Sequence, residues 1–84
     1  MTIAYSKAFI KQAKKLSPEL REQLQIRIIM FIKNPLNPLL RNHPLRGKYK
    51  DYRSINITGD MRALYLQNDD ETIFCAVGTH SQLY

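Results

Sequence analysis

The sequence predicts an α+β fold, in which an N-terminal edge strand is followed by a hairpin of two helices packed on a small antiparallel sheet. Two observations carry this prediction. Apolar residues recur at helical spacing between residues 7 and 33, and short β-like runs separated by turn residues fill the chain from Tyr52 onward. Because two amphipathic helices need an apolar surface to cover, we expect both on one sheet face, in the order β-α-α-β-β-β.

The first elements are a short strand and a helix. Residues 2–5 are too few for more than an edge strand, and Ser6 then stands where a helix N-cap accepts from free backbone amides. In the helix that follows, Phe9, Ala13 and Leu16 recur at i, i+4 and i+7 with Ile10 beside them, and the lysines fall largely on the other side. We therefore expect the apolar stripe to pack inward.

A second, longer helix begins at residues 17–19, Ser-Pro-Glu. Serine suits the N-cap, proline needs no amide at the first helical position, and glutamate favours the positive end of the helix dipole. Apolar residues keep a 3.6-residue period up to Ile32, and Asn34-Pro35 ends the helix. Residues 34–42 contain two prolines and several leucines, which predicts an ordered, non-helical connection.

Three strands are predicted at residues 52–57, 62–67 and 72–77, joined by two short hairpin turns. Alternation along the first strand separates an apolar set from a polar set that includes Ser54 and Asn56. With the helices on one face, we expect this polar set on the opposite, open face, which is then free for function.

Size and composition place the chain among small cytoplasmic proteins. With 84 residues and one cysteine, it is expected to form a single domain over residues 1–84 without an internal disulfide. It has no metal-ligand spacing and no apolar run suited to a signal peptide or a membrane span, so we expect no metal, no cofactor and no membrane partner. The net charge of +6 favours a polyanionic partner, with nucleic acid first and an acidic protein second.

The candidate chemistry is proton transfer between two histidines. His43 and His80 are the only histidines, and together with Asp60 they offer an acid and a base near neutral pH. Each also has a structural interpretation, because surface histidines are usually only solvated and Asp60 follows a glycine in a turn.

Fixed positive charge for a phosphate is the second component of the candidate site. The basic residues that can provide it are Arg46, Lys48, Arg53 and Arg62. Arg53 lies within a strand, where it is equally suited to a structural ion pair.

Several segments together carry a resemblance to a known family. They are His43-Pro44-Leu45 with Gly47 and Tyr49, the strand Tyr52-Arg53-Ser54-Ile55-Asn56-Ile57, Asp60, Tyr65, and the terminal Gly78-Thr79-His80-Ser81-Gln82-Leu83-Tyr84. In this combination the sequence resembles the YafQ branch of the RelE/ParE toxin superfamily. The resemblance implies a RelE/ParE-like fold and a type II toxin, silenced by a cognate antitoxin, that cleaves mRNA in the ribosomal A site.

The resemblance also implies a metal-independent mechanism and roles for individual residues. The ribose 2′-hydroxyl attacks the adjacent phosphate and leaves a 2′,3′-cyclic phosphate. His80 is expected to act as general acid and His43 or Asp60 as base. His43, Asp60, His80 and Tyr84 match active-site positions of the family, and Tyr84 is expected to stack on a base. The other residues expected to hold the phosphate or the RNA are Lys48, Arg53 and Asn56 and, from their charge more than from the resemblance, Arg46 and Arg62.

Two residues depart from the family pattern. Asn56 stands where the family has histidine, and Met61 stands where it has tryptophan, so one ionisable group and one stacking surface are expected to be missing. The consequences left open are a slower enzyme, a different base, or a toxin homologue that only binds RNA or antitoxin. A ParE-like DNA gyrase poison is the alternative from another class, because the same fold supports both functions.

Overall fold

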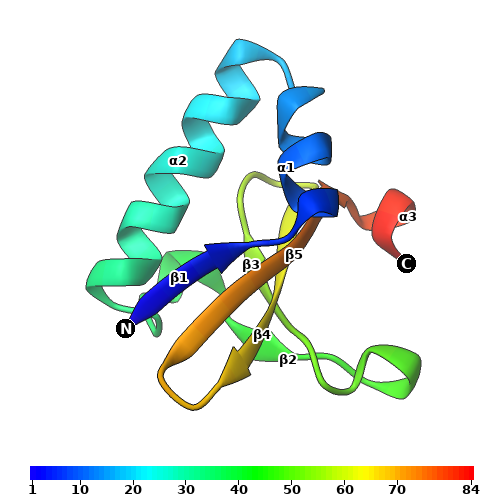
Figure 1. The fold of residues 1–84 in the computed structure, drawn as a ribbon. Coiled ribbons are helices and arrows are strands. Elements are labelled where there is room, and N and C mark those ends of the chain that lie inside the picture. Colours follow the sequence, from blue (N-terminus) through cyan, green and yellow to red (C-terminus); the bar gives the residue numbers. More distant parts are fainter.

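The structure, a computed structural model, describes residues 1–84 and has the predicted α+β class, with helices packed on a five-stranded mixed sheet (Figure 1). The strands are β1 (Thr2–Tyr5), β2 (His43–Pro44), β3 (Arg53–Asn56), β4 (Met61–Asn68) and β5 (Glu71–Thr79). The helices are α1 (Lys7–Lys14), α2 (Pro18–Lys33) and α3 (His80–Leu83), with two short 3-10 turns, η1 (Pro38–Leu40) and η2 (Gly47–Tyr49). The three predicted main strands and both predicted long helices are present.

The sheet has the strand order β1-β5-β4-β3-β2. The antiparallel meander β3-β4-β5 was expected, whereas β1 adds a parallel edge, with Thr2 opposite Glu71 and Tyr5 opposite Phe74. The helix hairpin makes this possible, because it carries the chain away from β1 and lets the last strand lie beside the first. The two-residue strand β2 closes the other edge and brings His43 opposite Ser54.

Both predicted N-caps are confirmed. The Ser6 hydroxyl accepts from the Phe9 amide at 3.0 Å, and the Ser17 hydroxyl accepts from the Leu20 amide at 3.3 Å. These bonds satisfy amides that have no partner inside the first helical turn. No helix combines the length and apolar content that crossing a membrane requires.

One hydrophobic core lies between the helices and the sheet. Phe31 of α2 makes edge contacts with Tyr65 at 5.0 Å and with Phe74 at 5.5 Å between ring centroids, and all three are buried. Met61 belongs to this core, at 5% exposure. The methionine that stands here in place of the family's tryptophan therefore belongs to the core. The prediction that Met61 removes a stacking surface from the polar site is wrong.

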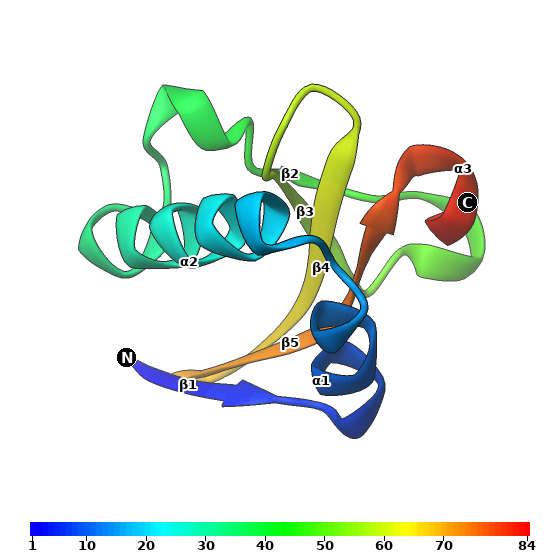
Figure 2. The same ribbon diagram turned by 90° about the horizontal axis from the view of Figure 1, so that it is seen from above.

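The second sheet face is less open than predicted. Ser54 is fully buried on this face instead of exposed, and Leu64, its partner on β4, is buried as well. In Figure 2, α2 lies on one side of β4, and η2 and α3 lie on the other side. The sequence pattern could not show this cover, because α3 and η2 are too short to have a periodicity of their own.

The bulge in β5 explains a second difference from the alternating pattern. Tyr65 pairs with Phe74 and Leu64 pairs with Ala76, which leaves Cys75 as an extra residue between them. Cys75 is consequently half-buried at the bulge, although its apolar neighbours predict a core position. Partial burial raises the pKa of the Cys75 thiol, because desolvation disfavours the thiolate.

Candidate active site

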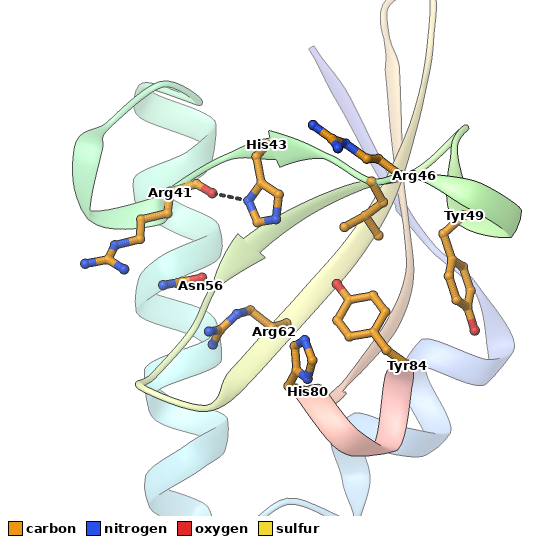
Figure 3. A pocket seen from close by; sticks show the side chains of 9 residues that line it. Arg41, His43, Arg46, Tyr49, Asn56, Arg62, His80 and Tyr84 are labelled. Carbon is orange, nitrogen blue, oxygen red and sulfur yellow. Dashed lines mark hydrogen bonds between the residues drawn. The ribbon is translucent and has the colours of Figure 1, made fainter.

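A cavity of about 410 Å³ opens on the sheet face that α3 and η2 partly cover. Its lining comes from the loop after η1, β2, the η2 segment, β3, β4 and α3 (Figure 3). The lining residues are Arg41, His43, Leu45, Arg46, Tyr49, Asn56, Arg62, His80 and Tyr84. Both histidines of the chain therefore face one cavity, although 36 residues separate them in the sequence.

The tautomer of His43 follows from its hydrogen bond. Its Nδ1 lies 2.7 Å from the backbone carbonyl of Arg41, and a carbonyl oxygen can only accept, so Nδ1 carries the hydrogen. In the neutral ring, Nε2 then holds the lone pair and can take a proton. Arg41 has a left-handed backbone, with φ of 46°, in the turn that directs its carbonyl toward His43. A non-glycine residue in this conformation is strained by about 1–2 kcal/mol, and such strain concentrates at functional sites.

His80 is the first residue of α3, and several contacts hold this short helix. The Thr79 hydroxyl accepts from the Gln82 amide at 3.2 Å and the Gln82 side chain accepts from the Thr79 amide at 2.8 Å, which forms a capping box. The His80 amide donates to the backbone carbonyl of Asp60 at 3.1 Å. The imidazole lies against the ring of Tyr84, with 4.6 Å between centroids. These contacts restrict the position of the imidazole before any ligand binds.

The charged side chains of the cavity are arginines. Arg41, Arg46 and Arg62 line it, and no Asp or Glu side chain does. The one ion pair of the whole structure joins the N-terminal amine to Asp70, so these guanidinium groups have no acidic partner within 4.0 Å. Unpaired arginines around two imidazoles suit an anionic ligand such as a phosphate.

Arg62 is held in place by the β3–β4 turn. Its Nη1 donates to the backbone carbonyls of Thr58, Gly59 and Met61 at 3.3, 3.2 and 3.1 Å. Asn56 is its direct cross-strand partner. The remaining guanidinium N–H groups make no hydrogen bond within the protein and are free for a ligand.

Six of the residues predicted for the site meet in the cavity, and three do not. Those that line it are His43, His80, Arg46, Arg62, Asn56 and Tyr84. The carboxylate of Asp60 does not line it, and this residue contacts the site only through its backbone bond to His80. Lys48 lies outside the lining, with its ammonium 5.2 Å from the centroid of the Tyr49 ring.

Arg53 has a structural environment. Its Nε donates to Oδ1 of Asn42 at 2.9 Å, and the hydroxyl of Tyr65 donates to the same oxygen at 3.0 Å. Arg53 does not line the cavity. This geometry favours a structural role for Arg53 over phosphate binding, but the expected ion pair is wrong, because the partner is the neutral Asn42.

Sequence reasoning did not single out Arg41, Leu45 or Tyr49 as site residues, yet all three line the cavity. Their proximity to His43 in the sequence was the available signal. The Tyr49 hydroxyl donates a hydrogen bond to the carbonyl of Leu83 at 2.9 Å. This contact could not be predicted from the sequence, because the two residues are 34 positions apart.

Comparisons with known proteins show a family to which the whole chain is similar. The sequence profile of the family described as "Bacterial toxin of type II toxin-antitoxin system, YafQ" matches residues 1–84. The mRNA interferase toxin YafQ of Escherichia coli K12 is 29% identical, over 98% of this chain and 94% of that protein.

Solved structures extend the similarity to three dimensions. The crystal structure of YafQ from E. coli BL21(DE3) has a TM-score of 0.84 and 28% identity, over 98% of this chain and 96% of the other. YafQ in its complex with DinJ, an E. coli toxin–antitoxin pair, has a TM-score of 0.81 and 28% identity, over 98% of this chain and 94% of the other. The chain therefore belongs to the YafQ family of bacterial type II toxin–antitoxin toxins.

Proposed function

We propose that this protein is an mRNA endoribonuclease that cleaves through attack of a ribose 2′-hydroxyl on the adjacent phosphate. The observation that carries the proposal is the meeting of His43 and His80 in one cavity whose charged side chains are otherwise all arginines. The similarity to a protein named mRNA interferase supports the same substrate class. Transfer to the 2′-oxygen needs a base, an acid and stabilisation of negative charge, and the lining offers all three.

In the proposed reaction, Nε2 of His43 takes the proton of the 2′-hydroxyl. The 2′-oxygen forms a bond to phosphorus, and the bond from phosphorus to the 5′-oxygen of the next nucleotide breaks. Protonated His80 gives its proton to that leaving oxygen, so the products are a 2′,3′-cyclic phosphate and a 5′-hydroxyl. Each proton transfer is expected to contribute about 10²–10⁴ in rate. Arg62 and Arg46 stabilise the charge on the phosphate.

The reaction as proposed needs no metal or cofactor, because the side chains supply the proton transfers and the positive charge. Asp60 is the less suitable base, since its carboxylate lies outside the cavity lining. Asn56 can hydrogen-bond the substrate but cannot shuttle a proton. Tyr84 offers an aromatic face on which a base can stack. The proposed substrate is mRNA in the ribosomal A site, which places the activity in the cytoplasm.

We also propose a cognate antitoxin, in keeping with the DinJ complex of the E. coli relative. A groove of about 480 Å³ runs between α1 and α2, lined mainly by apolar side chains that include Ile10, Ile29 and Ile32, each 44–48% exposed. Lys14 and Arg21 belong to the same lining. This combination fits an amphipathic helix with an apolar face and acidic flanks.

The test is RNA 5′-end mapping with purified protein, programmed ribosomes and, in a separate reaction, DNA gyrase. Cleavage within codons, with 2′,3′-cyclic phosphate ends, is expected for the native protein. His43→Ala and His80→Ala should each lower the rate at least about 100-fold. Arg21→Gln, on the other side of the sheet, is the control. A double histidine variant that cleaves at the native rate, or cleaved DNA with intact mRNA, would contradict the proposal.

A further inference from the structure

A second cavity, also of about 410 Å³, adjoins the first at its arginine end. Arg41, Asn56 and Arg62 line both cavities. Figure 3 shows these three side chains at one end of the first cavity and Tyr49 and Tyr84 at the other. The two cavities therefore adjoin each other at Arg41, Asn56 and Arg62, and the second cavity has no histidine in its lining.

The second cavity has the same electrostatic character as the first. Its charged lining residues are Arg27 from α2, Arg41 from the loop after η1 and Arg62 from β4, and no acidic residue lines it. None of the three has a carboxylate within 4.0 Å. Three unpaired guanidinium groups from distant segments repel one another, and an anion between them removes this repulsion.

Two of these arginines are already oriented by backbone carbonyls. Nη1 of Arg27 donates to the carbonyl of Leu39 at 2.7 Å, and Nη1 of Arg62 donates to three carbonyls of its own turn. Each bond restrains a long side chain and leaves the other guanidinium N–H groups without a protein partner. Restraint before binding lowers the entropy cost of ordering these side chains around a ligand.

We propose that this second cavity binds a phosphodiester of RNA next to the scissile position, with Arg27 as its distinguishing ligand. The proposal rests on the proposed function, because it takes the first cavity as the cleavage site. The phosphodiester belongs either to the continuing mRNA strand or to ribosomal RNA beside it. Both offer the same chemistry to Arg27, so the experiment has to separate them.

The experiment measures binding without cleavage. One ligand is a short single-stranded RNA with 2′-O-methyl groups throughout, which lacks the attacking hydroxyl, and the other is the ribosome without mRNA. Affinities are measured against salt for the native protein, Arg27→Gln and Arg27→Lys. Lys33→Gln removes the same charge from an exposed position of the same helix, outside both cavities and the groove between α1 and α2, and serves as the matched control. Thermal unfolding of each variant checks the fold.

Arg27→Gln is expected to weaken binding about tenfold at low salt and to reduce the salt slope by about one, whereas Lys33→Gln stays near native. A loss of affinity for the methylated RNA identifies the mRNA strand as the source of the phosphodiester. A loss of affinity for the ribosome alone identifies ribosomal RNA as that source. Arg27→Lys should recover much of the salt slope. Native affinity of Arg27→Gln for both ligands, or an equal loss of affinity in Lys33→Gln, would overturn the proposal.

These outcomes do not depend on the catalytic assignment. If the double histidine variant still cleaves while Arg27→Gln loses affinity, the proposed mechanism fails and the phosphodiester cavity stands. If cleavage needs both histidines while Arg27→Gln binds as the native protein does, the cavity proposal fails alone.

Discussion

The hydroxyl of Tyr49 donates a 2.9 Å hydrogen bond to the backbone carbonyl of Leu83, at the end of α3. The ring of Tyr49 also makes edge contacts with Tyr52 and Tyr84, at 6.0 and 5.8 Å between centroids. A helix of four residues has too few internal hydrogen bonds to stay ordered alone. Tyr49 therefore holds the element that presents His80 to the cavity.

Removing this hydroxyl should affect cleavage more than folding. Tyr49→Phe keeps the ring and loses one hydrogen bond, so we expect a stability loss of about 1 kcal/mol and a roughly tenfold slower cleavage rate. Rates on programmed ribosomes and thermal unfolding measure the two effects. Tyr52→Phe, which removes a hydroxyl that does not contact α3, is the control. Native cleavage by Tyr49→Phe would show that α3 is held without this bond.

Gly78 tests the capping box of α3. A Cβ at this position would lie 2.9 Å from Oε1 of Gln82, the atom that accepts from the Thr79 amide. Because this is the end of a flexible side chain, we expect Gly78→Ala to lose only about 1 kcal/mol while the cap is broken and cleavage slows. Gly59→Ala is the control, since nothing lies within 4 Å of its Cβ. Equal rates for the two variants would contradict this role.

The two interpretations of Arg53 can be separated by comparison with Arg46. Arg53 bonds Asn42, whereas Arg46 lines the cavity and is exposed. We expect Arg53→Met to lose about 1 kcal/mol of stability, because Oδ1 of Asn42 loses one of the two hydrogen bonds that it accepts. Its affinity for RNA should stay native. Arg46→Met should keep native stability and weaken RNA binding. Urea unfolding and binding to methylated RNA measure both, and weaker RNA binding by a stable Arg53→Met would restore Arg53 to the site.

Ser54 carries the one buried side-chain oxygen that has no hydrogen-bond partner. Burying an unpaired hydroxyl is unfavourable, so Ser54→Ala is expected to leave stability unchanged or to raise it by up to about 1 kcal/mol. The midpoint of urea unfolding measures the change. A loss of stability larger than about 1 kcal/mol would show that the hydroxyl has a partner, such as a bound water molecule.

The groove between α1 and α2 gives a prediction about the antitoxin. Ile29 lines the groove and Ile26 does not, although the two are 46% and 43% exposed on the same helix. We expect Ile29→Glu to weaken antitoxin binding at least about tenfold, because it removes an apolar contact and its charge repels an acidic flank of the antitoxin. RNA cleavage by this variant should remain normal. Ile26→Glu is the matched control. Equal affinities of both variants, by calorimetry with the antitoxin, would place the antitoxin elsewhere.

The local parts of the fold could be predicted from the sequence, because they depend on neighbouring residues. The N-caps Ser6 and Ser17 satisfy amides three residues ahead, and the period of α2 follows from 3.6 residues per turn. For the same reason the three main strands were predicted within one or two residues at each end. The two histidines were also identifiable, since few side chains exchange protons near neutral pH.

Long-range contacts could not be predicted from the sequence. The parallel pairing of β1 with β5, and the Tyr49 bond to Leu83, join residues that are far apart in the chain. The bulge at Cys75 could not be predicted either. An alternating pattern assumes that a strand has no extra residue, and one extra residue changes which face the later side chains occupy.

The sequence by itself determined the two long helices, the three main strands, the histidine pair and the excess of positive charge. Only the tertiary structure decided which charges share the cavity, because Arg62 and Arg46 reach it while Arg53 is engaged by Asn42 and Asp60 is not part of the lining. The same holds for the tautomer of His43, which the Arg41 carbonyl sets through one hydrogen bond. These outcomes depend on the packing of segments that local residue preferences do not place relative to one another.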